Sequence, residues 1–355
     1  MQKITIKTSK EYDVFVGAGV LDDAGAIVKR YVGGNRSTVV AIVTDDIVAP
    51  MYGGRFRGAL EKSGYQVIQY VFPNGEDSKN AATFLSILNF LATQNIGRTD
   101  IVAALGGGVA GDLAGFAAAC YLRGIRLVQV PTTLLAAVDS SVGGKTAINL
   151  PTGKNMAGAF YQPEVVICDV STLSTLPAGV FRDGAAEVIK HGIIADRPLF
   201  NSLKEPIQDR LETVVARNVE IKRDIVAADE FEAGDRKLLN LGHTVGHAIE
   251  ALSNHATPHG SAVATGMAIV ARAAARMGIC GDDCTQNILD MLKRYALPTT
   301  TIYDAKQLAH ACIADKKRDG KDITMIFPEK IGKCIMKKIK IDDLESVIEQ
   351  GLDDV

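Results

Sequence analysis

The spacing of apolar residues divides the chain into two parts near residue 170. Before that point, short β-branched runs alternate with stretches of helical spacing. The pattern predicts strands at 39–43, 65–71, 100–105, 127–130 and 165–168, and helices at 50–62, 80–94 and 109–122. Because strands alternating with helices favour βαβ units, we expect a largely parallel sheet covered by helices.

Beyond about residue 171 the β pattern nearly disappears and helical spacing dominates. The predicted helices are 179–194, 210–229, 236–253, 259–277 and 284–295, and a late pair, 322–327 and 333–338, predicts a small hairpin. We therefore expect an α/β domain over residues 1–170 and a mostly helical domain over residues 171–355. A length of 355 residues is compatible with two domains.

Composition and charge argue against several classes of partner. The net charge is −2, with 47% hydrophobic and 23% charged residues, so global electrostatics favour neither nucleic acid nor an anionic membrane. The most apolar run, 101–122, contains Asp112 and several glycines, which indicates buried core rather than a membrane span. The N-terminus shows no apolar signal core, and the six cysteines form no CxxC pair. We expect reduced thiols and a cytoplasmic protein.

The densest chemical signal is the segment 239–250, LNLGHTVGHAIE, which is followed by His259. On a helix, His243 and His247 lie on one face, where two imidazoles can hold a divalent metal with a third ligand from elsewhere. Four of the six histidines fall between residues 243 and 259. A helix with two satisfied histidines explains the spacing as well, so the spacing leaves both interpretations open.

Glu187 and two glycines add to this segment. Glu187 lies in an otherwise apolar stretch, where a carboxylate needs a partner. Either a salt bridge to Lys190 or a role as third metal ligand beside His243 would supply one. Gly242 and Gly246 each cost a helix about 1 kcal/mol relative to alanine. Such glycines predict the close approach of another backbone or a ligand.

A glycine cluster follows a predicted buried strand in the N-terminal half. The strand 101–105 leads into Gly106-Gly107-Gly108-Val109, where backbone N–H groups and a helix N-terminus can approach a pyrophosphate. Asp45 follows another strand and could accept a hydrogen bond from a ribose hydroxyl. A tight turn that requires positive φ explains the glycines equally well, and helix capping explains Asp45 equally well. Lys145 and Lys154 lie in glycine-bearing segments, where a buried anion or solvent could be the partner.

The order of the motifs resembles that of 3-dehydroquinate synthases, within the sugar-phosphate cyclase superfamily, over nearly the whole chain. The matching segments are 106–112, 131–136, 138–145, 153–155, 186–190, 239–247 and 259–260. This resemblance implies a Rossmann-like NAD-binding domain followed by a helical metal-binding domain, with the active site between them. It also implies a homodimer.

The resemblance revises the interpretation of the histidines. It implies that Glu187, His243 and His259 bind the metal, most often zinc and in some cases cobalt. His247 would then contact a substrate phosphate rather than the metal. The segment 315–317 also resembles a family motif that carries a site lysine, either Lys316 or Lys317.

The resemblance also assigns substrate and cofactor residues. For the substrate phosphate it implies Lys145, Asn155, Asn240 and His247, with Arg123 from the partner subunit. For the substrate carboxylate it implies Lys222 and Arg236, and for the hydroxyls Asp139, Lys154 and Lys190. For NAD it implies Asp45, Glu76, Lys79, Gly106, Gly107, Gly108, Val109, Asp112, Thr132, Thr133, Lys145, Lys154 and Thr175.

The implied reaction is redox-neutral. It converts 3-deoxy-D-arabino-heptulosonate 7-phosphate to 3-dehydroquinate and phosphate, a step of the shikimate pathway to aromatic amino acids. The implied order is transient oxidation by NAD, β-elimination of phosphate, re-reduction, ring opening and intramolecular aldol closure, which makes the enzyme a carbon–oxygen lyase.

Three alternatives stay open at this point. They are a sister cyclase of the 2-epi-5-epi-valiolone or 2-deoxy-scyllo-inosose synthase type, a metal-dependent polyol dehydrogenase on the same fold, and a non-catalytic NAD-binding protein. Asn240 favours 3-dehydroquinate synthase over the sister cyclases, and Lys222 with Arg236 favours an acidic substrate.

Overall fold

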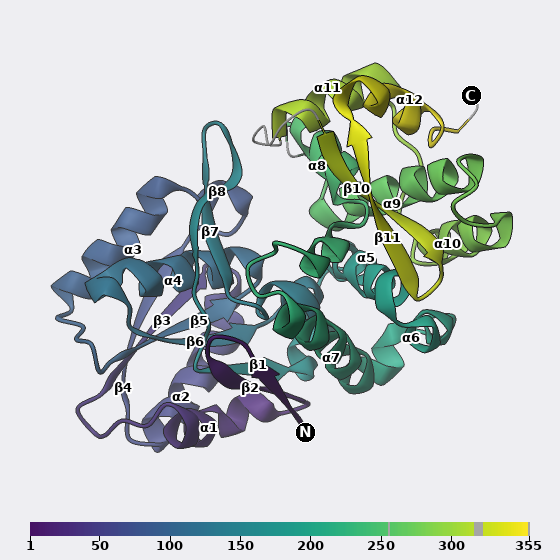
Figure 1. The fold of residues 1–355 in the computed structure, drawn as a ribbon. Coiled ribbons are helices and arrows are strands. Elements are labelled where there is room, and N and C mark those ends of the chain that lie inside the picture. Colours follow the sequence, from purple (N-terminus) through teal and green to yellow (C-terminus); the bar gives the residue numbers. More distant parts are fainter. Residues whose placement is uncertain (255, 316–321, 354–355) are drawn as a thin grey trace. The chain divides into compact units, whose positions relative to one another are not determined.

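The computed structural model describes residues 1–254, 256–315 and 322–353, which belong to two compact units (Figure 1). Unit 1 comprises Met1–Pro177 and Arg210–Glu230, and unit 2 comprises Ala178–Asp209 and Phe231–Val355. The division differs from the expected boundary at residue 170 in one important respect. The segment Arg210–Glu230, which the sequence placed in the second domain, belongs to the first.

Helix α7 (Leu211–Ala228) explains this correction. It packs on β1 (Gln2–Lys7) and β2 (Glu11–Gly17), which form an N-terminal hairpin that the sequence analysis did not predict. Just after the helix, the Glu230 carboxylate accepts hydrogen bonds from the backbone N of Ser9 at 2.6 Å and from Gln162 at 2.8 Å. Tertiary packing therefore ties this helix to the sheet, although its own sequence does not distinguish it from the helices of unit 2.

Unit 1 is built on a seven-stranded sheet with the order β1-β2-β9-β6-β5-β3-β4. All neighbouring pairs are parallel except β1–β2. This confirms the predicted Rossmann-like α/β architecture. The remaining elements of unit 1 are β3 (Val39–Asp45), β4 (Gln66–Phe72), β5 (Ile101–Gly106), β6 (Arg126–Pro131), β9 (Val165–Asp169), α1 (Ala24–Tyr31), α2 (Gly54–Lys62), α3 (Ala81–Thr93), α4 (Gly108–Cys120), and a separate antiparallel hairpin of β7 (Lys145–Leu150) and β8 (Gly153–Phe160).

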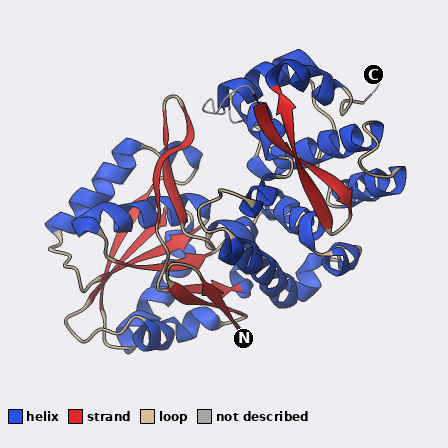
Figure 2. Ribbon diagram, in the orientation of Figure 1, coloured by secondary structure: helices blue, strands red, loops and turns tan. Residues whose placement is uncertain are grey.

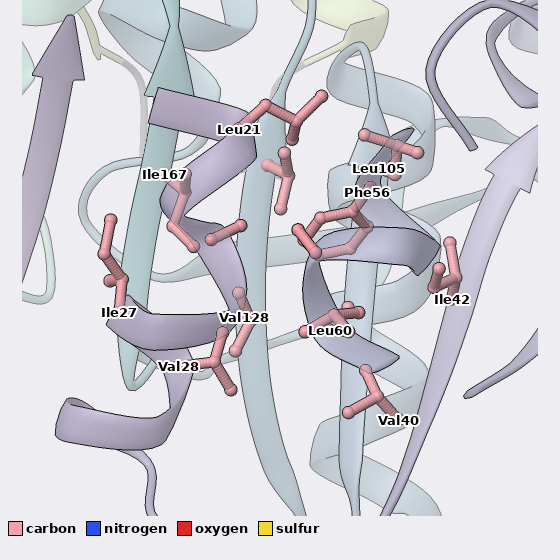
Figure 3. Close-up of a cluster of buried hydrophobic side chains, with 14 of the residues drawn as sticks. Leu21, Ile27, Val28, Val40, Ile42, Phe56, Leu60, Leu105, Val128 and Ile167 are labelled. Atoms are coloured by element: carbon pink, nitrogen blue, oxygen red, sulfur yellow. The ribbon is translucent and has the colours of Figure 1, made fainter. Parts of the chain in front are cut away.

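Helices cover both faces of this sheet (Figure 2). Because side chains alternate along a strand, Val40 and Ile42 enter the core beside α1 and α2, while Ala41 and Val43 enter the core beside α3 and α4. Figure 3 shows the first of these cores, where Phe56 of α2 lies among strand residues. Burial on both faces accounts for the continuous apolar runs that predicted the strands.

The strand order reverses between β3 and β5. The chain passes from β3 outward to β4, then returns across β3 to β5 and continues toward β6. In open parallel sheets, ligands bind at the carboxyl ends of the strands at such a switch point. Asp45 ends β3 and Gly106 ends β5, so the topology brings these two predicted cofactor residues together.

Unit 2 is mostly helical, as predicted, with one hairpin of β10 (Asp322–Lys330) and β11 (Lys333–Lys340). Its helices are α5 (Ala178–Ala195), α6 (Arg197–Ser202), α8 (His243–Leu252), α9 (His259–Arg276), α10 (Asp282–Arg294), α11 (Ala305–Asp315) and α12 (Leu344–Glu349). Helix α9 is buried along most of its length and packs against α5, α8, α10, α12 and β10. A helix apolar on all sides is typical of a central core element.

The predicted helix 236–253 is wrong as a single element. A short 3-10 helix (η8, Asp235–Asn240) ends before Gly242, which has a φ of 78°, and α8 begins at His243. Glycine adopts this left-handed conformation without a steric penalty. The break makes His243 the first residue of a helix rather than an interior one. Among the described residues, none of the helices is long and apolar enough to cross a membrane.

Candidate metal and dinucleotide sites

Three residues of unit 2 direct ligand atoms toward one point. Glu187 lies in the middle of α5, and His243 and His259 are the first residues of α8 and α9. The Nε2 atoms of both histidines lie 3.6 Å from Oε1 of Glu187. Ligands bound tetrahedrally at 2.0–2.1 Å from zinc lie roughly 3.3 Å apart. The three atoms therefore fit a divalent cation with only small adjustments.

The other ring nitrogens of both histidines face acceptors. Nδ1 of His243 lies 3.1 Å from the carbonyl oxygen of Leu241, and Nδ1 of His259 lies 2.6 Å from Oε1 of Glu250. Metal-binding histidines commonly use their second nitrogen in this way. The donor set and its surroundings both suit a metal.

The structure confirms the salt bridge of Glu187 to Lys190, and the role of Glu187 as a metal ligand stays a prediction. The carboxylate is fully buried, and its Oε2 forms an ion pair with Nζ of Lys190 one turn later on α5. Its buried Oε1 accepts no hydrogen bond from the described residues. Burial opposes ionisation, but the charge of Lys190 and the contacts with both histidines hold the pKa of Glu187 well below its usual range. The carboxylate is therefore charged and available as a ligand.

The two histidines differ in protonation because their surroundings differ. Burial, together with the charge of Lys190, lowers the pKa of His243 to about 3. Burial also acts to lower the pKa of His259, but the contact with Glu187 and the hydrogen bond to Glu250 outweigh it and raise this pKa to about 10. His243 is thus neutral, as a metal ligand must be, and a bound cation would take the place of a proton on His259.

The structure separates His247 from the Glu187 group. Its ring centroid lies 5.6 Å from that of His243, and its ligand atom groups with Glu250 and His259 instead. On η8, Asn240 donates to Oε1 of Glu232 at 2.7 Å, and Arg236 is buried with an exposed fraction of 1%. These predicted substrate residues therefore share unit 2 with the ligand group.

The glycine cluster of unit 1 forms a turn with positive φ that leads into the N-terminus of α4. Gly106 has a φ of 156°, and a Cβ there would lie 2.7 Å from the Cβ of Ala110. Gly107 precedes α4, whose first turn has no side-chain cap. Oγ1 of Thr132, at the end of the neighbouring strand β6, is buried without a hydrogen-bond partner among the described residues. An uncapped helix N-terminus beside an unsatisfied hydroxyl suits a pyrophosphate.

Asp45 caps the turn that follows β3. Its Oδ1 accepts hydrogen bonds from the backbone N of Ile47 at 2.9 Å and of Val48 at 2.8 Å. Its Oδ2 lies 3.5 Å from the position that a Cβ of Gly106 would occupy. Asp45 therefore caps a turn rather than a helix, because the helical segment that follows begins after Val48 and has no side-chain cap. Its second oxygen is directed toward the glycine loop.

Lys79 links predicted cofactor residues with a predicted substrate residue. Its Nζ lies 2.5 Å from Oδ2 of Asp112 and donates to Oδ1 of Asn155 at 2.5 Å. Glu76 accepts a hydrogen bond from Asn149 on β7 at 2.8 Å. Burial raises the pKa of Asp112, although the charge of Lys79 opposes this effect. The segment 153–155 is the start of β8, which brings Asn155 to this network.

Two predicted substrate residues also meet within unit 1. Nζ of Lys222 on α7 lies 2.8 Å from Oδ1 of Asp139. The remaining predicted residues of unit 1 lie in several places. Lys145 on β7 and Arg123 are exposed, and Lys154 on β8 is half-buried; Arg123 has a φ of 65°. Oγ1 of Thr133 accepts a hydrogen bond from the backbone N of Ala136 at 3.2 Å, and Oγ1 of Thr175 lies 2.6 Å from the hydroxyl of Tyr52. Gly108 and Val109 begin α4. Lys316, Lys317 and His255 lie outside the described residues.

Sequence reasoning missed two carboxylates near the group of Glu187, His243 and His259. Glu250 contacts His259, and Oδ1 of Asp183 on α5 accepts from the backbone N of Ser261 at 2.9 Å, in the first turn of α9. Glu250 stands seven residues after His243, which places both on one helix face. That spacing was the available signal for Glu250, whereas the contact of Asp183 arises only from the packing of α5 against α9.

Comparison with solved structures places the whole chain in one fold class. A 2-deoxy-scyllo-inosose synthase, solved with carbaglucose-6-phosphate, NAD+ and Co2+, is 25% identical with a TM-score of 0.87 and covers 99% of this chain and 100% of its own. A 2-epi-5-epi-valiolone synthase from Streptomyces hygroscopicus, with NAD+ and Zn2+ bound, is 24% identical with a TM-score of 0.87 and covers 99% of both chains. Glycerol dehydrogenase from Schizosaccharomyces pombe has a TM-score of 0.66 at 15% identity, covering 99% of this chain and 91% of its own. The chain has the fold of the sugar-phosphate cyclases.

Sequence comparison defines the family within that class. Residues 69–183 match the 3-dehydroquinate synthase N-terminal domain, and residues 184–318 match the C-terminal domain. The 3-dehydroquinate synthase of Pelobacter propionicus is 43% identical over 97% of this chain and 98% of its own length, and that of Caulobacter vibrioides is 45% identical over 93% and 92%. The chain belongs to the 3-dehydroquinate synthase family, which confirms the resemblance read from the motifs.

Proposed function

We propose that this chain converts 3-deoxy-D-arabino-heptulosonate 7-phosphate to 3-dehydroquinate and phosphate, using NAD and a divalent metal, most readily zinc, with cobalt as a substitute. Family membership supports the reaction. The observation that carries the cofactor part is the convergence of Glu187, His243 and His259, with both Nε2 atoms 3.6 Å from the same carboxylate oxygen. We further propose a cytoplasmic homodimer in which Arg123 serves the partner subunit.

The residues of unit 2 would hold the metal and part of the substrate. When bound, a divalent cation supplies Lewis acidity that lowers the pKa of a coordinated hydroxyl. Glu187 and the neutral form of His243 provide charge and a lone pair for it, while Lys190 keeps the carboxylate ionised. The buried guanidinium of Arg236 offers a planar pair of donors that suits the substrate carboxylate. Asn240 and His247 would donate hydrogen bonds to the substrate phosphate.

The residues of unit 1 would hold NAD and the remaining substrate groups. When bound, NAD supplies a hydride acceptor that is regenerated within the same turnover, so it is not consumed. The backbone N–H groups at the uncapped start of α4, near Gly107 and Gly108, would bind the pyrophosphate, and Asp45 lies at the switch point of the sheet. Lys222 pairs with Asp139, so substrate binding would exchange one carboxylate partner of Lys222 for another.

Proton transfer would also depend on positioned side chains of this chain. Lys154 and Lys190 are proposed to orient the substrate hydroxyls, and Lys145 and Asn155 to fix the phosphate. A phosphate held next to the acidified C–H could accept that proton itself, because proximity replaces the need for a separate base. Asp139 would contact a ring hydroxyl.

A substrate panel tests this function. Phosphate release is measured with catalytic NAD from 3-deoxy-D-arabino-heptulosonate 7-phosphate, sedoheptulose 7-phosphate and glucose 6-phosphate, each with and without a chelator. We expect chelator-sensitive release from the sugar acid alone. Release from either neutral sugar phosphate, but not from the acid, would refute the proposal and indicate a sister cyclase. Steady NADH formation with glycerol would indicate a polyol dehydrogenase.

A further inference from the structure

Glu250 is a buried carboxylate that no step of the proposed reaction uses. It lies on the last turns of α8 with an exposed fraction of 1%, and its Oε1 lies 2.6 Å from Nδ1 of His259 on α9. We propose that Glu250 is a positioning residue, which fixes the tautomer and the ring orientation of His259 and thereby sets the metal affinity of the site. This inference rests on the proposed metal site.

The contact distance distinguishes a positioning role from a ligand role. Two atoms bound to one zinc ion lie roughly 3.3 Å apart, whereas a charge-assisted hydrogen bond is about 2.7–2.9 Å long. At 2.6 Å, Oε1 of Glu250 and Nδ1 of His259 are at hydrogen-bond distance. His247, Glu250 and His259 also bring ligand atoms close together. In this group the contact between Glu250 and His259 is a hydrogen bond, so we do not assign a metal to it.

A carboxylate at Nδ1 determines what the opposite nitrogen can do. A carboxylate oxygen only accepts hydrogen bonds, so it holds a proton on Nδ1 of His259. Once a cation has displaced the remaining proton, the ring presents the lone pair of Nε2, which lies 3.6 Å from Oε1 of Glu187. The carbonyl oxygen of Leu241 likewise holds a proton on Nδ1 of His243. Nε2 of His243 then lies 3.6 Å from Oε1 of Glu187. Both lone pairs thus converge without a choice of tautomer.

Helix α8 carries both the proposed ligand His243 and the positioning residue Glu250. His243 and Glu250 are separated by seven residues, two turns of α8, and so lie on the same face toward α9. Two glycines let the helix backbones meet. A Cβ at Gly266 would lie 2.0 Å from the carbonyl oxygen of Gly242, and a Cβ at Gly246 would lie 3.1 Å from backbone atoms of Ala262. Because this contact is between backbones, the distance from Glu250 to His259 is set by rigid elements rather than by a loop.

The test measures metal binding to the purified full chain without substrate. Cobalt(II) affinity is determined by competition with a chromophoric chelator, and the visible absorption spectrum of the bound cobalt reports its ligand geometry. We expect Glu250→Leu to weaken binding by about 10- to 100-fold and to change the cobalt spectrum. Glu250→Gln keeps an acceptor oxygen, so its affinity should lie between those of Glu250→Leu and the unchanged chain.

Asp196→Asn is the matched control. Asp196 is also a buried carboxylate of unit 2, and it caps α6 by accepting from the backbone N of Leu199 at 2.7 Å. We expect this variant to lose stability but to keep cobalt affinity. Equal loss of affinity in Asp196→Asn and Glu250→Leu would overturn the proposal, because it would indicate general destabilisation.

The remaining outcomes are also decisive. Unchanged affinity and an unchanged spectrum in Glu250→Leu would overturn the positioning role. If Glu250→Leu fails to fold, Glu250→Gln decides, since unchanged affinity and spectrum in this nearly isosteric variant would overturn it as well. Absence of cobalt binding in the unchanged chain would refute the metal site of the proposed function, a result that is distinguishable from failure of the inference.

Discussion

Substitution of Gly266 by alanine should destabilise unit 2, although alanine is the better helix former. Gly266 lies inside α9, and a Cβ there would lie 2.0 Å from the carbonyl oxygen of Gly242 and 3.0 Å from the backbone N of Gly246. Ordinary contact begins at 3.4 Å, so the backbones must separate by about 1.4 Å. Neither neighbour is a flexible side chain that could rotate away.

The magnitude follows from two opposing effects. Alanine gains about 1 kcal/mol of helix propensity over glycine. Overpacking, including the backbone shifts that it forces, typically costs about 1–3 kcal/mol. Because the contact is between two helix backbones, we expect a cost at the upper end, about 3 kcal/mol, and hence a net loss of about 2 kcal/mol. For a unit of this size, that loss lowers the melting temperature by roughly 4–8 °C.

Differential scanning calorimetry of the metal-free chain measures this effect. Gly179→Ala is the matched control, because Gly179 lies in the first turn of α5 and a Cβ there meets nothing within 4 Å. The control should leave stability unchanged or raise it by up to about 1 kcal/mol. A melting temperature of Gly266→Ala equal to or above that of the control would refute the described packing of α8 on α9.

Three further predictions concern other parts of the molecule. Asp169→Ala should lower the stability of unit 1 by about 3 kcal/mol in urea unfolding, because the buried carboxylate accepts hydrogen bonds from the backbone N of Gly19, Leu21 and Ser171. A loss below about 1 kcal/mol would contradict this prediction. Zinc at 100 times its Kd should stabilise the chain by about 2.7 kcal/mol, which raises the melting temperature by roughly 5–11 °C, and His259→Ala should abolish that increase. A persistent zinc effect in His259→Ala would place the metal elsewhere. Arg236→Lys should lower kcat/KM for the sugar acid phosphate roughly tenfold or more, because it loses the planar fork, while the Kd for NAD measured by titration stays unchanged. A parallel loss of NAD affinity would count against a carboxylate-binding role.

Local sequence patterns predicted the strands of the parallel sheet because their side chains are buried on both faces. Val39 to Val43 and Ile101 to Leu105 are continuous apolar runs for this reason. The glycines of the histidine segment likewise predicted close backbone approach, and the structure confirms it at Gly242 and Gly246. The same signal at Gly242 could have predicted the break between η8 and α8, since a left-handed residue ends a helix.

Contacts between distant segments were beyond the reach of these patterns. The spacing of α7 is that of an ordinary amphipathic helix, and only its packing on β1 and β2 assigns it to unit 1. The helical spacing of His243 and His247 allowed a metal pair, whereas the structure groups His243 with Glu187, 56 positions earlier, and with His259 on another helix. Periodicity describes the face of one helix and contains no information about which helix lies opposite. The grouping of Glu187, His243 and His259 came instead from the resemblance of the motif order to a known family.

The most direct test of the central claim is a count of phosphate released against NADH accumulated in one reaction. The chain is incubated with excess 3-deoxy-D-arabino-heptulosonate 7-phosphate and NAD at the concentration of enzyme, while absorbance at 340 nm is followed and phosphate is assayed. The redox-neutral account predicts many phosphates released per NAD with no net NADH. One NADH accumulated for each turnover, or release that stops after one turnover per NAD, would contradict it.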